Sequence, residues 1–479
     1  MIVQAMKKNK LYNKWRNMSP AAKASLALVF AKFVQRGLSM ISGPIFTRIM
    51  PQAEYGVVST FTSWQSVLYI IATLNMGSGI FNNGMLEFKE DRESFMASIM
   101  VLANLCTLTM CLLLALGYKW IINFLELPLI LIVVMILYFF TTPAYNYWLG
   151  WQRFEYKYKS TTIVIIVSSF VSTLVAILVV LATPEKDKAI AKLLVTEGVQ
   201  IALGIIFSCY IQIRAKCKID TRYWKYALKY QLPLIPHYLS MYVLSSLDRI
   251  MISKMTSTSD TAIYNVAYTV ASIMLIFWNA IDASYAPWIY QKLEIGKKKD
   301  IQKRGNQILF LFAGATLLSA LFAPEIIKVL APQSYYRGVY VIPSVAAGVF
   351  FTAVFSLYMR VELYYKDTKF AMYATCAAAV INICLNYIFI PIIGFYAAGY
   401  TTLISYMALA FAHWLNLRRL HASDAYDNKM IALLSIGTVI IAIAIMLLYN
   451  HSVVRYIAIV SILAVAISKR RIVIGTFRK

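Results

Sequence analysis

Apolar runs of about twenty residues recur along almost the whole chain, and each is long enough to cross roughly 30 Å of hydrocarbon. Two of them, residues 163–182 and 431–448, are apolar on every helical face, whereas the strands of a membrane barrel alternate apolar and polar residues. Hydrophobic residues make up 60% of the chain and charged residues 14%, against roughly 45–50% and 25% in soluble domains. The sequence therefore predicts an all-α membrane protein.

Hydropathy predicts about 14 transmembrane helices. They are expected at residues 24–47, 55–75, 95–117, 128–149, 161–182, 189–213, 228–252, 261–289, 306–323, 339–359, 370–390, 394–416, 430–449 and 453–468. With a cytoplasmic N-terminus, the two tails and the even-numbered loops hold most of the 46 Lys and Arg, and the odd-numbered loops hold far fewer. This asymmetry follows the positive-inside rule and predicts a multi-pass membrane protein with both termini in the cytoplasm.

The net charge of +25 has the same explanation. Because the basic residues lie mainly in the predicted cytoplasmic loops and tails, we expect them to contact anionic membrane lipids, and we expect no nucleic acid as partner. Docking of an acidic partner enzyme is the alternative for these loops.

A weak internal repeat indicates two lobes. Leu38–Met40 recurs as Leu239–Met241 and Arg48–Met50 as Arg249–Met251, both at an offset of 201 residues. Six helices separate the two copies, and because six is an even number both copies have the same orientation in the membrane. This arrangement is found in transporters whose halves are related by an axis along the membrane normal. The predicted divisions are a basic tail 1–23, an N-lobe 24–213, a basic loop 214–229, a C-lobe 230–416, two added helices within 430–468 and a basic tail 469–479. Substrate is expected between the two six-helix lobes, in a central cavity.

Cations at membrane depth are the first functional candidates, because ionisable groups there are costly and usually face a bundle interior or a wet cavity. Lys32 and Arg36 lie four residues apart and so share a helix face. Arg48 and Arg249 occupy equivalent places in the repeat. These four are the predicted cavity cations, although the Lys32 stem can also snorkel to the interface.

Acidic residues at depth are candidates for binding a coupling ion. Asp282, Asp248 and Glu197 lie inside predicted helices, where a carboxylate can take up a proton or cation on one side and release it on the other. A structural ion pair is the alternative, above all for Asp248 beside Arg249. Glu362, two residues from Arg360 at a helix end, is expected to snorkel to the interface.

Two prolines, Pro233 and Pro236, break the start of the helix at 228–252 and precede His237. A break of this kind frees backbone carbonyls in the membrane and marks either a hinge or a site, or serves packing alone. Aromatic rings in the same region are possible sugar contacts, chiefly Tyr242, Tyr268 and Trp278.

Several motifs are missing from the chain. It contains no phosphate-binding loop of the GxxxxGK[ST] type, no HExxH and no GxSxG, and its six cysteines form no CxxC. We therefore expect no catalytic residues, no metal site and no cofactor.

The chain resembles polysaccharide-biosynthesis flippases of the Wzx type, in the multidrug/oligosaccharidyl-lipid/polysaccharide superfamily. The resemblance rests on Arg36-Gly37 with Pro44, Thr47–Pro51, Glu54–Gly56, Tyr230–His237, Ser246–Arg249 and Ala262–Tyr268. It implies transport of undecaprenyl-diphosphate-linked repeat units of O-antigen, capsule or exopolysaccharide, including those of lipopolysaccharide, from the inner to the outer leaflet. It also implies that Arg36, Arg48 and Arg249 meet the diphosphate or acidic sugars.

The expected mechanism is alternating access coupled to a proton or Na⁺ gradient, in a monomer that works beside the polysaccharide polymerase machinery. Two alternatives stay open. A drug/cation antiporter of the same superfamily needs an acidic cavity, which the predicted cations disfavour. A membrane polymerase or ligase needs a large outer loop, and none is predicted.

Overall fold

The computed structural model describes residues 18–468 of the 479-residue chain, and within that range the chain is helical, with no strand. Each of the fourteen predicted segments lies in a helix or in a run of consecutive short helices. Eight helices of the described range are long and apolar enough to cross a membrane, and α14 with α15, which are bent by 57° at a short break, adds a ninth. The predicted fold class, an all-α membrane protein, is confirmed. Apart from residues 18–23, the predicted basic tails lie outside the described residues.

The first compact unit holds residues 18–51 and 68–235 of the described chain. Within it, α2 packs along α8 and α7 packs along α9. Its core contains stacked rings of Phe81 and Tyr147, whose centroids are 5.2 Å apart. Its elements are α2 (Pro20–Ile49), α4 (Gly79–Glu87), α5 (Arg92–Leu116), α6 (Tyr118–Leu125), α7 (Leu129–Phe154), α8 (Tyr158–Ala182), η1 (Glu185–Asp187), α9 (Lys188–Arg214), α10 (Thr221–Gln231) and η2 (Leu232–Leu234).

The second compact unit holds residues 52–67 and 236–468. Helix α3 (Gln52–Thr73) begins in this unit and ends in the first. The remaining elements are α11 (Ile235–Tyr242), the π-helical η3 (Val243–Leu247), α12 (Asp248–Met255), α13 (Thr258–Glu294), α14 (Lys298–Leu321), α15 (Ala323–Leu330), η4 (Gln333–Val341), α16 (Ile342–Tyr364), α17 (Thr368–Ile393), α18 (Tyr396–Arg419), η5 (Ser423–Ala425), α19 (Asn428–Leu448) and α20 (Ser452–Ser468).

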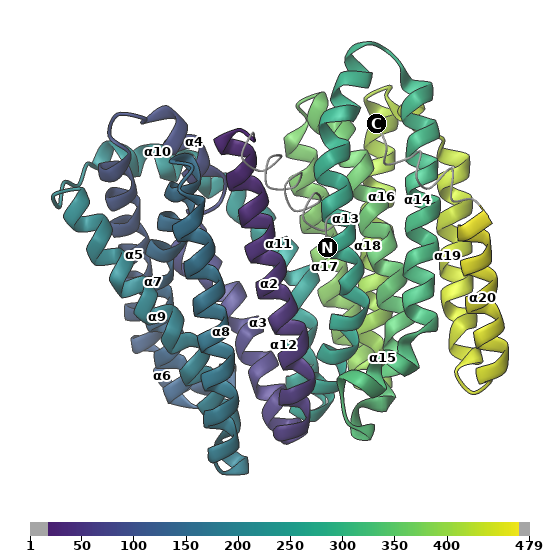
Figure 1. Ribbon diagram of the computed structural model, residues 1–479, viewed down its shortest axis with the longest axis horizontal. Coiled ribbons are helices and arrows are strands. Elements are labelled where there is room, and N and C mark those ends of the chain that lie inside the picture. Colours follow the sequence, from purple (N-terminus) through teal and green to yellow (C-terminus); the bar gives the residue numbers. More distant parts are fainter. Residues whose placement is uncertain (1–17, 469–479) are drawn as a thin grey trace, which may run out of the picture. The chain divides into compact units, whose positions relative to one another are not determined.

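Helix α16 is the centre of the second unit. Its neighbours are α13, α14, α18 and α19, as Figure 1 shows for this part of the chain. The candidate membrane span that contains α16 is Gln333–Tyr364, and 89% of its apolar part is buried inside the protein. The same fraction is 50% or less for each of the other single-helix spans of the described range. A polar group on α16 therefore meets other helices instead of lipid.

Ordinary local signals set many helix ends. Pro51 and Pro128, with φ of −55°, stand immediately before α3 and α7, where a fixed φ and a missing N–H cost nothing. The Ser257 side chain caps α13 by accepting a hydrogen bond from the Asp260 N–H at 3.0 Å. Gly394 ends α17 with φ of +67°, a left-handed conformation that favours glycine.

The predicted helix at 228–252 is not continuous. The chain runs from α10 through the 3₁₀ turn Leu232–Leu234 into α11, then through the π segment Val243–Leu247 into α12. The 3₁₀ turn contains Pro233 and α11 contains Pro236, where proline removes a backbone donor. The π segment contains no proline, so the proline pattern of the sequence does not predict it. It sets the position of the residues that come next.

Candidate functional site

The π segment Val243–Leu247 leads directly into Asp248, the first residue of α12. Single-turn π segments inside α-helices are frequent at functional sites because they redirect the side chains that follow. Here the next two side chains are both charged and both buried: Asp248 is 0% exposed and Arg249 is 8% exposed. A buried ion pair in this position needs partners from several helices to offset its desolvation.

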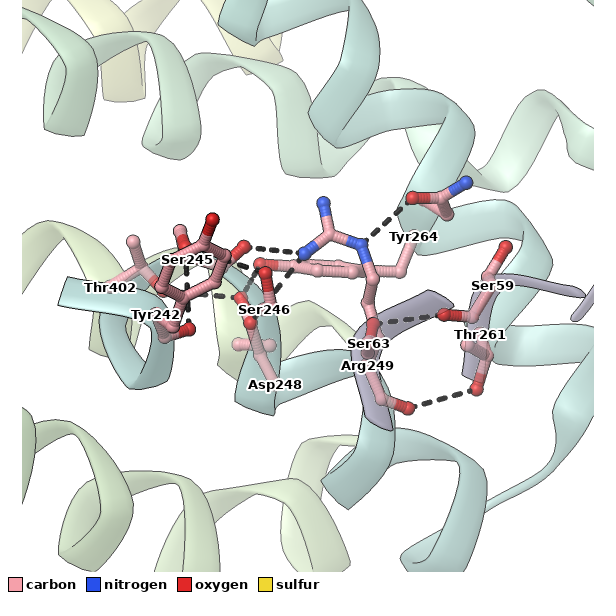
Figure 2. Close-up of polar contacts among 12 residues, drawn as sticks. Ser59, Ser63, Tyr242, Ser245, Ser246, Asp248, Arg249, Thr261, Tyr264 and Thr402 are labelled. Carbon is pink, nitrogen blue, oxygen red and sulfur yellow. Dashed lines mark hydrogen bonds and ion pairs between the residues drawn. The ribbon is translucent and has the colours of Figure 1, made fainter. Parts of the chain in front are cut away.

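Asp248 receives its partners from α13 and α18. The Tyr264 hydroxyl donates a hydrogen bond to Oδ2, and the Thr402 hydroxyl lies 3.4 Å from the same oxygen (Figure 2). The other oxygen, Oδ1, has no hydrogen-bond partner within the described residues, and the nearest charged atom is Nη1 of Arg249 at 3.9 Å. One oxygen of a fully buried carboxylate is thus left with unused acceptor capacity.

Arg249 makes contacts of a different kind. Its Nη1 donates to the Ser245 carbonyl at 2.6 Å (Figure 2). Its Nε donates to Oδ1 of Asn265 at 2.8 Å. The guanidinium lies over the ring of Tyr268, 4.3 Å from its centroid. The π segment therefore supplies an acceptor, and α13 supplies an amide and an aromatic face to a buried cation.

A further polar cluster on α17 and α18 adjoins Asp248 through Thr402. The Asn382 amide lies 3.5 Å from the Thr402 hydroxyl, and Asn386 donates to Asn382 Oδ1 at 3.1 Å. Thr401 donates to Asn386 Oδ1. All four side chains are at most 2% exposed. The sequence prediction missed this cluster, although two Asn four residues apart within an apolar helix are an available signal.

Asp282, one of the three acids predicted to bind the coupling ion, is part of an ion pair. Arg360 of α16 donates from Nε to Asp282 Oδ1 at 3.0 Å and from Nη2 to Oδ2. The side chain of Asp282 is 15% exposed and that of Arg360 is 25% exposed. Both carboxylate oxygens of Asp282 are engaged, in contrast to Asp248.

The predicted cations Lys32, Arg36 and Arg48 all lie on α2 of the first unit, and their side chains are exposed. Lys32 donates to Gln35 at 3.2 Å and Arg48 donates to the Pro44 carbonyl at 2.9 Å. Glu197 on α9, in the same unit, is 9% exposed. Arg249 belongs to the second unit, so the predicted cations divide between the two units.

The remaining predicted contacts differ widely in exposure. Tyr242 is 40% exposed, whereas Trp278 is 1% exposed and packs against Phe312 with ring centroids 5.3 Å apart. The imidazole Nδ1 of His237 lies 3.0 Å from the Thr375 hydroxyl, and the carbonyl of Pro236 accepts from the Ser240 hydroxyl at 2.7 Å. Of the three predicted aromatic contacts, Tyr268 is the one that lies against a charged group of the site, the guanidinium of Arg249.

A helical membrane bundle with a broken helix and a buried ionic cluster is the architecture of a transport protein in the multidrug/oligosaccharidyl-lipid/polysaccharide exporter superfamily. The chain belongs to the family of polysaccharide biosynthesis proteins, whose model matches residues 21–292. A second model, described as MatE, matches residues 233–388. No curated protein sequence matches the chain.

Solved structures with the same fold cover nearly the whole chain. The lipid II flippase MurJ in an inward closed conformation is similar with a TM-score of 0.63 and 14% identity, over 94% of this chain and 99% of that protein. An inward-facing multidrug resistance MATE transporter of the MOP superfamily has a TM-score of 0.61 and 12% identity, over 84% and 98%. An outward-facing MATE transporter has a TM-score of 0.55 and 13% identity, over 85% and 97%. At these identities the likeness shows the fold.

Proposed function

We propose that the chain is a flippase that moves undecaprenyl-diphosphate-linked oligosaccharide repeat units from the inner to the outer leaflet of a bacterial inner membrane. The observation that carries the proposal is the match to polysaccharide biosynthesis proteins over residues 21–292, on a fold that a lipid II flippase shares along 94% of this chain. O-antigen, capsule and exopolysaccharide repeat units are the proposed cargoes.

The physical problem of this transport suits a protein without a catalytic domain. The polyprenol tail can stay in the lipid throughout, while the diphosphate and the sugars must be kept from hydrocarbon, where an unpaired charge is prohibitive. Lys32, Arg36, Arg48 and Arg249 are the proposed partners of the diphosphate and of acidic sugars. Alternating access of the two lobes, with both termini in the cytoplasm, remains the proposed mechanism.

We assign the coupling ion, a proton or Na⁺, to Asp248 in preference to Asp282 and Glu197. Asp248 is fully buried, has an oxygen without a hydrogen-bond partner in the described chain, and adjoins the hydroxyl and amide groups of Thr402 and Asn382. Oxygen-rich surroundings of this kind suit a small hard cation or a proton. Asp282 has both oxygens engaged by Arg360.

The test is a strain that lacks this gene, complemented with wild type, Arg36→Ala, Arg249→Ala or Asp248→Asn, with the membrane level of each protein measured. Repeat units trapped on the cytoplasmic leaflet of the deletion strain, and released by wild type, support the flippase. Asp282→Asn is the matched acid control for Asp248→Asn. If repeat units reach the outer leaflet but stay unpolymerised, a polymerase or ligase function replaces the proposal.

A second candidate is a MATE-like drug/cation antiporter. The MatE model matches residues 233–388, and this region includes Asp248 and Asp282. Efflux of a fluorescent organic cation from cells that express the chain distinguishes the two functions. Gradient-dependent efflux that Asp248→Asn abolishes, with normal repeat-unit export in the deletion strain, favours the antiporter.

A further inference from the structure

A second buried ionisable pair lies on α16 and α18, apart from the Asp248 cluster. The Nδ1 atom of His413 is 2.8 Å from Oε2 of Glu362, and both side chains are 0% exposed. The imidazole stacks on Phe355 at a centroid distance of 5.9 Å and meets the edge of Phe370 at 6.0 Å. The pair is thus enclosed by aromatic rings, and the sequence expectation that Glu362 snorkels to the interface is wrong.

Each member of the pair has a polar atom without a partner. Glu362 Oε1 and His413 Nε2 are buried and make no hydrogen bond within the described residues. With a neutral imidazole, the pair carries one negative charge in a low-dielectric interior, which is costly unless another charge compensates it. One added proton makes the pair an imidazolium beside a carboxylate, with no net charge.

The charged groups around the pair are already committed to other partners. From α13, Asp282 is bound by Arg360, and from the turn before α17, Asp367 is bound by Arg419 and by the Asn416 amide at 3.1 Å. From α11, His237 is engaged by Thr375, whose hydroxyl lies 3.0 Å from the imidazole Nδ1. No charged contact to the pair is recorded from α14 or α19 among the described side chains. Within the described residues, no lysine or arginine lies within salt-bridge distance of Glu362.

We propose that Glu362 and His413 form a proton-binding site that joins α16 to α18. A proton from water binds the imidazole, the pair becomes neutral, and the buried contact between the two helices is favoured. Loss of the proton leaves a buried negative charge, so this contact is destabilised and α16 and α18 separate or admit water. The site is distinct from Asp248, and its existence does not depend on what the protein transports.

The chain contains only four histidines, which makes the site accessible to nuclear magnetic resonance. The experiment uses the full-length protein in lipid nanodiscs with ¹⁵N-labelled imidazoles, recorded between about pH 8 and pH 5, the range in which histidine serves as a protonation switch. The His413→Gln variant assigns the His413 signals. His421 and His451, which are exposed, serve as internal reference signals in the same sample.

We expect the His413 ring to gain one proton over this range in wild type, with a chemical shift that marks a hydrogen bond to a carboxylate. In Glu362→Gln, which keeps an acceptor of the same shape, we expect His413 to stay neutral, with the signals of His421 and His451 the same as in wild type. A wild-type His413 signal that does not change with pH overturns the proposal. The same titration in wild type and Glu362→Gln also overturns it.

Discussion

The ends of α2 and the start of α12 carry the same Arg-Ile-Met sequence, and their comparison separates local geometry from function. Arg48 Nη1 donates to the carbonyl four residues earlier, Pro44, at 2.9 Å, and Arg249 Nη1 donates to the carbonyl of Ser245 at 2.6 Å. Yet the side chain of Arg48 is exposed, whereas Arg249 is buried, with only 8% of its surface exposed. The repeat therefore preserves the backbone contact of the guanidinium and not its surroundings.

The residue before each arginine differs in chemistry. Thr47 is a neutral side chain whose hydroxyl donates to the Pro44 carbonyl at 3.0 Å, whereas Asp248 is an acid that side chains of α13 and α18 reach. A buried acid that draws partners from distant helices appears in one copy of the repeat. Of the two copies of the repeat, the copy in the second unit is therefore the one with a buried acid before its arginine, and this acid follows the π segment directly.

The largest expected effect is that of removing this acid. Asp248→Ala leaves Arg249 buried without its nearest counter-charge and removes the acceptor of the Tyr264 hydroxyl, so the free energy of unfolding should fall by about 3–5 kcal/mol. Unfolding of purified protein in lipid–detergent micelles measures this loss. The matched change Thr47→Ala should cost about 1 kcal/mol, because it removes a neutral hydroxyl and leaves no buried charge without its counter-charge. Equal losses for the two variants would remove the distinction between the copies.

The two arginines provide the next test. Arg249→Lys keeps the charge but cannot reach both Asn265 and the Ser245 carbonyl or stack on Tyr268 as a planar group, and should cost about 1–3 kcal/mol of stability. Arg48→Lys, at an exposed position, should change stability by less than about 0.5 kcal/mol. Thermal unfolding of both variants checks this, and a larger loss for Arg48→Lys contradicts the account.

Two glycines extend the comparison to packing. A methyl group on Gly56 of α3 would lie 1.8 Å from the Thr258 carbonyl oxygen of α13, whereas one on Gly37 of α2 meets nothing within 4 Å. We expect Gly56→Ala to destabilise the protein by about 1–3 kcal/mol through overpacking. Gly37→Ala should be neutral or stabilising by up to about 1 kcal/mol, since alanine favours a helix interior. Thermal unfolding decides the sign, and a stable Gly56→Ala protein contradicts the close approach of α3 and α13.

The smallest expected effect concerns the ion pair of Asp282 and Arg360, because both side chains keep some exposure. A double-mutant cycle with Asp282→Asn and Arg360→Gln should give a coupling energy of about 1 kcal/mol. If Asp282 binds the coupling ion instead, Asp282→Asn will abolish gradient-dependent transport while Arg360→Gln leaves it in place.

The sequence contains most of the fold but only part of the candidate site. The apolar runs are local signals for helices, and Pro51 and Pro128 are local signals for the starts of α3 and α7. Each of the fourteen predicted segments therefore corresponds to a helix or to a run of short helices. Asp248 and Arg249 are visible as charges inside an apolar segment. Their partners are not, because Tyr264 and Thr402 lie 16 and 154 residues from Asp248 and meet it only through helix packing.

Glu362 shows why position along a helix is a poor guide to burial. Its place near the end of an apolar segment and beside Arg360 favours the interface, but α16 is surrounded by other helices and its end is covered as well. Arg360 turns to Asp282, 78 residues away, and Glu362 turns to His413, 51 residues away. Pairings of this length depend on which helices are neighbours, and hydropathy does not contain that information.

Reconstituted transport is the most direct test of the central claim. Purified protein is placed in liposomes with an undecaprenyl-diphosphate-linked oligosaccharide in one leaflet, and its appearance in the other leaflet is followed with an impermeant sugar-modifying reagent, with and without an ion gradient. The account predicts gradient-stimulated transfer by wild type, weak transfer by Asp248→Asn and normal transfer by Asp282→Asn. Liposomes with folded wild type that transfer no more than protein-free liposomes would contradict it.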